Sequence, residues 1–160
     1  MGIMSRLWLL VKVSRPLSWP LVALLFGLGL AISGAAITAM AFLQLLLIAI
    51  LLPLIVFGIN DVYDCRADAI NKRKQSAIHG IALEERHHRF VSSAALASTI
   101  ALAVFSAFTR NPGNMVATAI AISLGWAYSE PPIRLKEKPV LDSLSNNALV
   151  FSVILLGYSY

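Results

Sequence analysis

Three aspartates on one short segment are the side chains of this sequence best suited to chemistry. Asp61, Asp64 and Asp68 follow Asn60, directly after a stretch from residue 17 to 60 that holds no charged residue and no histidine. In a helix, at about 100° per residue, Asp64 would lie about 60° and Asp68 about 20° from Asp61, so all three would point the same way. Their carboxylates would repel one another unless they share a cation. Mg²⁺ prefers such oxygen ligands, and the amide oxygen of Asn60 is a fourth candidate ligand, unless this residue only caps the helix.

Two other interpretations of the aspartates are open. They could be a solvated helix end without function, but a C-terminal helix end disfavours negative charge, so three acids there need a compensating cation. They could belong to a cation-binding multispan transporter, but such a protein is expected to carry charge within its spans, and the long apolar runs of this sequence have none. Metal-assisted chemistry, with Asp61, Asp64 and Asp68 as catalytic residues, is therefore the favoured interpretation.

A second polar segment, which follows Tyr128, supplies cations. Arg134 and Lys136 could neutralise phosphate oxygens that a metal ion leaves bare. The same charges could be ordinary basic residues beside a membrane. A third basic run adds Arg73 and Lys74 as further candidates, although adjacent basic residues are common in any cytoplasmic loop.

The elements that must position these residues are transmembrane helices. The sequence has 160 residues, of which 58% are hydrophobic and 13% charged, and its mean hydropathy is +0.77, which excludes an ordinary soluble globule. This composition predicts a multi-pass integral membrane protein with a single domain over residues 1–160, surrounded by membrane lipids. The net charge of +5 would indicate nucleic acid as a partner of a soluble protein, but here it reports topology, so no nucleic acid is expected.

An all-α, polytopic membrane helix bundle is predicted, with four full transmembrane helices and a partial fifth. The uncharged stretch 17–60 would be about 66 Å long as one helix, about twice the thickness of a bilayer core, so it should form a helical hairpin that turns near residues 33–36. Runs 90–109 and 111–129 are each long enough for a further span. The last run, 143–160, is polar at its start and is expected to be only a partial span.

The lysines and arginines place the N-terminus in the cytoplasm. Of 13 such residues, all but Arg110 then lie on the cytoplasmic side, as the positive-inside rule requires. Both long polar loops, 60–89 and 129–142, fall on that face. We therefore expect the active face to be cytoplasmic.

The two polar segments also resemble those of a known family. Asn60-Asp61-x-x-Asp64-x-x-x-Asp68 is similar to the first aspartate-rich motif, NDxxDxxxD, of the UbiA-type intramembrane prenyltransferase superfamily, and it follows the second span as in that family. The later segment resembles the basic loop of the branch that prenylates carotenoids, the lycopene-elongase type. It reads Tyr128-Ser129-x-Pro131-Pro132-x-Arg134, followed by Pro139-Val140-Leu141-Asp142-Ser143.

This resemblance implies a transferase that moves a prenyl group from an isoprenyl diphosphate to a lipophilic acceptor, which is a carotenoid, a quinone precursor or a lipid. It assigns Mg²⁺ to Asn60 and the three aspartates, where the metal would assist departure of the diphosphate. It assigns the diphosphate itself to five polar residues: Tyr128, Arg134, Lys136, Arg73 and Lys74.

The resemblance covers essentially the whole chain but only the first half of a family member. Those proteins resemble nine-helix bundles with a second acidic motif, DxxxD, in their later spans, whereas this sequence has no Asp or Glu after Asp142. We therefore expect that a C-terminal half is missing or is supplied elsewhere, and that this chain alone has little activity. The alternative is an inactive, truncated fragment of such an enzyme.

Overall fold

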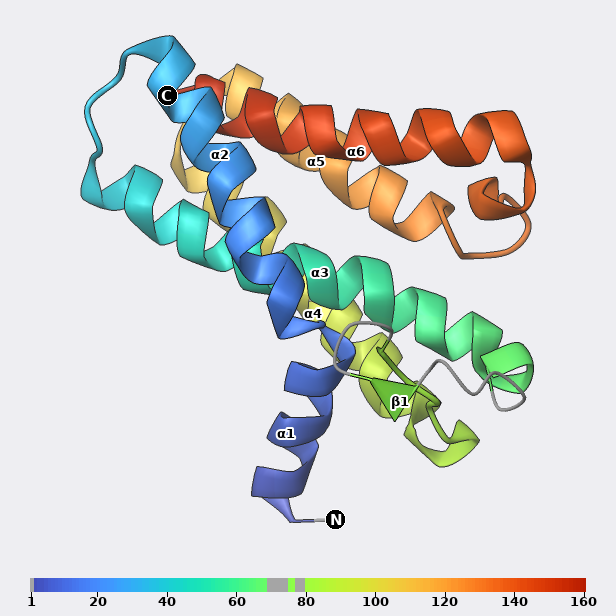
Figure 1. Cartoon of the computed structure of the whole chain (residues 1–160). Coiled ribbons are helices and arrows are strands. Elements are labelled where there is room, and N and C mark those ends of the chain that lie inside the picture. Colours follow the sequence, from blue (N-terminus) through green and yellow to red (C-terminus); the bar gives the residue numbers. More distant parts are fainter. Residues whose placement is uncertain (1, 69–74, 77–79) are drawn as a thin grey trace.

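The chain is a helical bundle, and the predicted all-α fold class is confirmed. The computed structural model describes residues 2–68, 75–76 and 80–160. The helices are α1 (Ile3–Val13), α2 (Trp19–Ser33), α3 (Ala39–Asp68), α4 (His88–Phe108), α5 (Pro112–Ala127) and α6 (Pro139–Tyr158). They are joined by the 3₁₀ turns η1 (Pro16–Ser18), η3 (Glu85–His87) and η4 (Leu135–Glu137), and by an antiparallel pair of two-residue strands, β1 (Gln75–Ser76) and β2 (Gly80–Ile81). Figure 1 shows this arrangement.

The first two spans form the predicted hairpin. α2 ends at Ser33, and Gly34 follows with a φ of 70°, a left-handed conformation that glycine adopts without strain. The chain then turns back, and α3 begins at Ala39. The turn therefore falls where the sequence places it.

Four segments of the described chain are long and apolar enough to cross a membrane: Pro16–Ser33, Ala39–Cys65, Glu85–Phe108 and Pro139–Tyr158. The last of these was expected to be only partial, yet α6 has 20 residues. Its polar first turns are compatible with a span because their side chains bond within the helix, Ser145 Oγ to the carbonyl of Asp142 at 3.0 Å and Asn147 Nδ2 to that of Ser143 at 2.8 Å. By contrast, α5, which lies in the run 111–129, is not among these four segments. It has only 16 residues, since Pro112 begins it and a turn follows Ala127.

α3 lies at the centre of the bundle. It packs against α2, α4 and α5, while α6 packs on α2 and α5. Because residues 39–59 of α3 are apolar on all sides except at Gln44, this part of the helix can contact several neighbours at once. The core between these helices consists of large, fully buried side chains: Phe26, Ile48, Leu52, Ile55, Leu102, Val153 and Leu156.

α2 and α6 approach each other backbone to backbone at two glycines. A Cβ atom added at Gly29 would lie 1.9 Å from the carbonyl oxygen of Ile154, and one added at Gly157 would lie 2.0 Å from that of Phe26. Between membrane helices, such close approach supplies the van der Waals contact that the hydrophobic effect does not. This crossing holds the N-terminal hairpin against α6.

A buried polar cluster ties the helices together at the end of the bundle opposite to the acidic segment. The side-chain amides of Gln44 and Asn114 exchange two hydrogen bonds of 2.9 Å. Ser106 Oγ donates to Asn114 Oδ1 at 2.7 Å, and Asn114 Nδ2 donates to Ser159 Oγ at 3.0 Å. α3, α4, α5 and the end of α6 are thereby joined, and the polar groups are satisfied internally, as a low-dielectric surrounding requires.

We predict that Gly29→Ala lowers the free energy of unfolding by roughly 1 to 3 kcal/mol, because the new methyl group must push α6 away. Gly27→Ala is the matched control, since the same helix has open space at Gly27 and alanine favours helix formation. Thermal unfolding of both variants in detergent micelles measures the difference. Equal melting temperatures for the two variants would contradict the close crossing of α2 and α6.

Candidate functional site

The loop between α5 and α6, residues 128–138, folds back on itself and is here named the basic loop. The amide of Lys136 donates to the carbonyl of Tyr128 at 3.2 Å, and the amide of Arg134 donates to that of Glu130 at 3.1 Å. Arg134 has a φ of 39°, a left-handed conformation that non-glycine residues adopt at a cost. This backbone turns Arg134 and Lys136 toward the C-terminal part of α3.

Asp64 of α3 is the residue on which these two cations converge. Arg134 Nη2 lies 3.2 Å from Asp64 Oδ1, and Lys136 Nζ lies 2.5 Å from Asp64 Oδ2. All three side chains are largely shielded from solvent, with 28%, 12% and 23% of the side chain exposed for Arg134, Lys136 and Asp64. The acidic segment and the basic loop, 70 residues apart in sequence, therefore form one site.

Asn60, one turn before Asp64 on α3, belongs to the same site. Its Oδ1 accepts hydrogen bonds from Lys136 Nζ at 3.1 Å and from Ser129 Oγ at 3.2 Å. Ser129 is fully buried, and sequence reasoning did not single it out. Because α3 continues to Asp68, Asn60 is an interior residue of the helix, so the alternative that it caps the helix is wrong.

Asp61 is fully buried and contacts a different cation, Arg15. Arg15 Nη2 lies 3.2 Å from Asp61 Oδ1, and the guanidinium carbon lies 4.2 Å from the centroid of the Phe57 ring. Arg15 has a φ of 50°, which is rare for a bulky residue and rarer before a proline. Sequence reasoning missed Arg15, although it is the last cation before the uncharged stretch.

The expected single stripe of three carboxylates is only partly described. Asp61 and Asp64 come from the same part of α3 but contact different cations, and Asp68 is described only as the last residue of that helix. Arg73 and Lys74 lie outside the described residues. Among the side chains that are described, no three Asp, Glu, His or Cys residues lie together as a metal cluster. The metal site with Asn60, Asp61, Asp64 and Asp68 stays a prediction.

Tyr128 links the basic loop to α6. Its hydroxyl donates to Asp142 Oδ1 at 2.9 Å, and Asn146 Nδ2 donates to the same oxygen at 3.0 Å. Burial is the largest cause that raises the pKa of Tyr128 above its ordinary value; Asn146 lowers it, and the hydrogen bond to Asp142 raises it further. Tyr128 is therefore a neutral donor at physiological pH, and Asp142 lies in the first turn of α6, where the helix dipole favours an acid.

An apolar cavity of about 260 Å³ lies between α2, α3 and α6 beside these polar residues. Its lining includes Phe57, which the Arg15 guanidinium covers, and Asn146, which is bonded to Asp142. The remaining lining residues are mostly aliphatic: Ser18, Leu21, Val22, Leu25, Leu52, Pro53, Val56, Leu149, Val150 and Val153. The site thus has a charged rim and an apolar interior.

The sequence is similar to a known family of membrane enzymes and to several curated proteins. The sequence model of the UbiA prenyltransferase family matches residues 19–160. A lycopene elongase/hydratase of Corynebacterium glutamicum is 30% identical over 154 residues, which are 96% of this chain and 53% of the relative. A lycopene elongase/hydratase of Halobacterium salinarum is 37% identical over 100 residues, 59% of this chain and 32% of that protein.

A third relative carries a carotenoid name as well. The C(50) beta-cyclic carotenoids biosynthesis protein LbtBC of Dietzia sp. is 28% identical over 146 residues, 91% of this chain and 34% of the relative. The chain therefore spans about half the length, or less, of these curated relatives. No solved structure gives a significant match.

The buried pair of Arg15 and Asp61 generates a stability prediction. Arg15→Gln should lower the free energy of unfolding by about 2 kcal/mol, because it removes a hydrogen bond from a charged donor to the buried Asp61. Arg15→Lys should cause a smaller loss, since it keeps the charge but not the planar group over Phe57. Chemical denaturation in detergent micelles measures both.

Arg110→Gln is the matched control for this prediction. Arg110 is also an arginine in a left-handed conformation, with a φ of 53°, but it is exposed on a turn between α4 and α5. Its replacement should leave the unfolding transition unchanged. If Arg110→Gln destabilised the chain as much as Arg15→Gln, the loss would come from the strained backbone and not from the pair with Asp61.

Proposed function

The chain belongs to the UbiA prenyltransferase family, and on that premise we propose that it binds an isoprenyl diphosphate for prenyl transfer to a lipophilic acceptor. The observation that carries this proposal is the convergence of Arg134 and Lys136 on Asp64. It brings a carboxylate, a type of ligand that Mg²⁺ prefers, to the same place as two cations of the type that binds phosphate. A diphosphate with a divalent cation needs such a combination.

Mg²⁺ is the proposed cofactor of this site. The donor set fits it, because Asp64 and Asn60 present carboxylate and amide oxygens one turn apart on α3, and Mg²⁺ is commonly held by one or two carboxylates together with substrate phosphates. Asp61 and Asp68 complete the proposed set. When bound, the metal would neutralise charge that develops on the departing diphosphate.

The cations of the basic loop would bind the diphosphate by exchanging partners. Each oxygen of Asp64 contacts one cation, Arg134 or Lys136, so Asp64 holds both cations in position. Phosphate oxygens would take the place of the Asp64 carboxylate in these contacts, which frees the carboxylate for the metal. Arginine suits this exchange because its fork matches phosphate oxygens in a bidentate way.

In the proposed reaction the allylic carbon–oxygen bond breaks and its electron pair leaves with the diphosphate. A double bond of the acceptor then forms a carbon–carbon bond with the allylic cation, and a proton is lost from the product. Arg134 and Lys136 would stabilise the leaving group, and such electrostatic stabilisation is usually the largest catalytic contribution. The diphosphate would depart toward this charged rim.

The apolar cavity would hold the hydrocarbon part of the substrates. It lies beside the charged rim and is lined mostly by apolar side chains, so it would keep water away from the allylic cation. The relatives are named lycopene elongase/hydratase, and we assign the acceptor of this chain to the same carotenoid class. The chain spans about half of the C. glutamicum relative. The property to test in this chain is therefore binding of the donor and not the complete reaction.

The cationic part of the proposal predicts that Lys136→Gln weakens binding of a labelled isoprenyl diphosphate about tenfold. The loss of one hydrogen bond from a charged donor, worth about 1.5 kcal/mol, has this size. Binding is measured by equilibrium dialysis on the full chain in lipid nanodiscs. Lys138→Gln, an exposed cation of the same loop, is the control and should bind like the wild type. Equal weakening in both variants would contradict a specific role of Lys136.

The metal part of the proposal predicts that donor affinity depends on Mg²⁺ and that Asp64→Asn abolishes this dependence. The same dialysis is carried out with Mg²⁺ and with a chelator. The corresponding prenyl alcohol, which lacks the diphosphate, should bind wild type and Asp64→Asn equally and so reports whether the apolar cavity is intact. Donor affinity that is indifferent to Mg²⁺ in the wild type would overturn the metal assignment.

A further inference from the structure

α1 is a helix outside the bundle of spans, and it has two apolar faces. Figure 1 shows it projecting away from the bundle, across the direction of α3. One face packs on the bundle, where Leu9 and Val13 join a buried cluster with Leu83 and Val91. The other face is uncovered: Ile3 and Met4 are each 80% exposed, Trp8 60% and Leu7 55%.

The uncovered face has the composition of a membrane-interface helix. At about 100° per residue, the four exposed apolar side chains fall on one side of α1. Tryptophan is enriched at the level of lipid headgroups, and amphipathic helices with such a face lie in the plane of the interface. α1 directly precedes the first span, so it lies where that span meets the interface.

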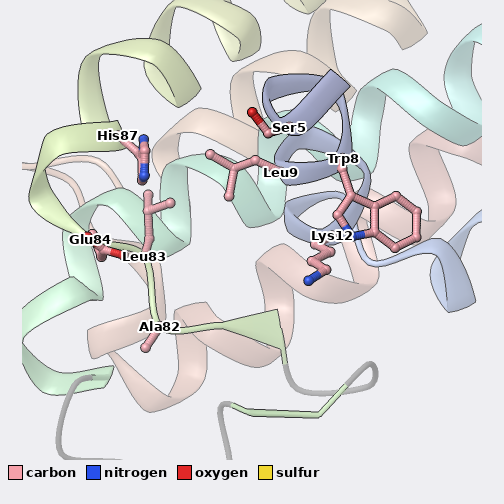
Figure 2. A pocket seen from close by; sticks show the side chains of 8 residues that line it. All are labelled: Ser5, Trp8, Leu9, Lys12, Ala82, Leu83, Glu84 and His87. Atoms are coloured by element: carbon pink, nitrogen blue, oxygen red, sulfur yellow. The ribbon is translucent and has the colours of Figure 1, made fainter. Parts of the chain in front are cut away.

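A pocket of about 250 Å³ opens beside this apolar face (Figure 2). Ser5, Trp8 and Lys12 of α1 line one side of it, and Glu84 and His87 line the other. The pocket lies between the exposed face of α1 and its packed face. A molecule whose polar group lies in this pocket could therefore place its apolar part over Ile3, Met4 and Leu7.

The charge of the pocket favours an anion. Glu84, the one carboxylate of the lining that the structure describes, forms an exposed ion pair with Arg86, whose Nε lies 2.8 Å from a Glu84 oxygen. Lys12 has no carboxylate partner among the described residues; its ammonium group lies 5.6 Å from the centroid of the Trp8 ring. Arg6 likewise lies 5.7 Å from the Phe90 ring, in a neighbouring hollow with Arg86 and His87.

We propose that this pocket binds the phosphate headgroup of an anionic phospholipid. Lys12 would contact the phosphate, Ser5 and the indole N–H of Trp8 would supply neutral donors, and the acyl chains would cover the exposed face of α1. The site lies apart from Asp64 and the basic loop, and it does not depend on the function proposed for them. Its effect would be to fix α1 on the membrane surface beside the first span.

The test uses quenching of Trp8 fluorescence by brominated lipids in proteoliposomes of the full chain. Phosphatidylcholine vesicles contain the same fraction of either brominated phosphatidylglycerol or brominated phosphatidylcholine. The chain has 3 tryptophans, so the difference between wild type and Trp8→Phe isolates the signal of Trp8. We expect Trp8 to be quenched more strongly by the anionic lipid.

Lys12→Gln should reduce the preference for phosphatidylglycerol about fivefold, which corresponds to about 1 kcal/mol for one cation near a lipid surface. Lys12→Arg should retain it. Arg89→Gln removes an exposed charge outside the pocket and should leave the preference unchanged.

Three outcomes would overturn the proposal. Equal quenching of Trp8 by both brominated lipids would show that the pocket does not select an anion. Equal losses in Lys12→Gln and Arg89→Gln would indicate general surface charge and no defined site. No quenching of Trp8 by either brominated lipid, together with a change in Trp8 fluorescence when inorganic phosphate is added, would indicate a pocket for a soluble anion.

Discussion

The pairing of one helix carboxylate with two loop cations is the interaction on which the candidate site depends. Asp64 holds Arg134 and Lys136, and through them it fixes the whole connection between α5 and α6 against α3. Ser129 of the same loop donates a hydrogen bond to Asn60 of α3. Tyr128 donates one to Asp142, which lies in the first turn of α6. Because burial makes unpaired charges costly, each of these groups constrains the position of its partners.

The helices that carry this site are held by contacts that work without the hydrophobic effect. Apolar side chains gain little from leaving lipid, so close backbone approach and internal hydrogen bonds must hold the spans together. Close backbone approach occurs where α2 and α6 cross at two glycines. Internal hydrogen bonds occur in the cluster around Gln44 and Asn114. These contacts fix α3 and α6 in place, and the two helices form walls of the apolar cavity beside the charged rim.

Two arginines illustrate how backbone and charge act together. Arg15 and Arg134 both have positive φ values, and both contact an aspartate of the same segment of α3. Strained backbone persists where the surroundings hold it, and an ion pair to α3 is one such contact at Arg15 and at Arg134. The N-terminal segment thereby becomes part of the site, because Arg15 reaches Asp61. α1, just before Arg15, lines the separate pocket to which we assign a lipid headgroup.

The sequence alone determined the helical class and the hairpin turn near Gly34, because composition and periodicity are local properties of a chain. From the same kind of local pattern it proposed Asn60, Asp61, Asp64 and Asp68 as candidate metal ligands, and this assignment stays a prediction. It also identified Arg134 and Lys136, and the structure brings both to Asp64. Only the tertiary structure showed which cation forms an ion pair with which carboxylate. The pairing of Arg15 with Asp61 depends on a contact between residues far apart in sequence, for which no local pattern exists.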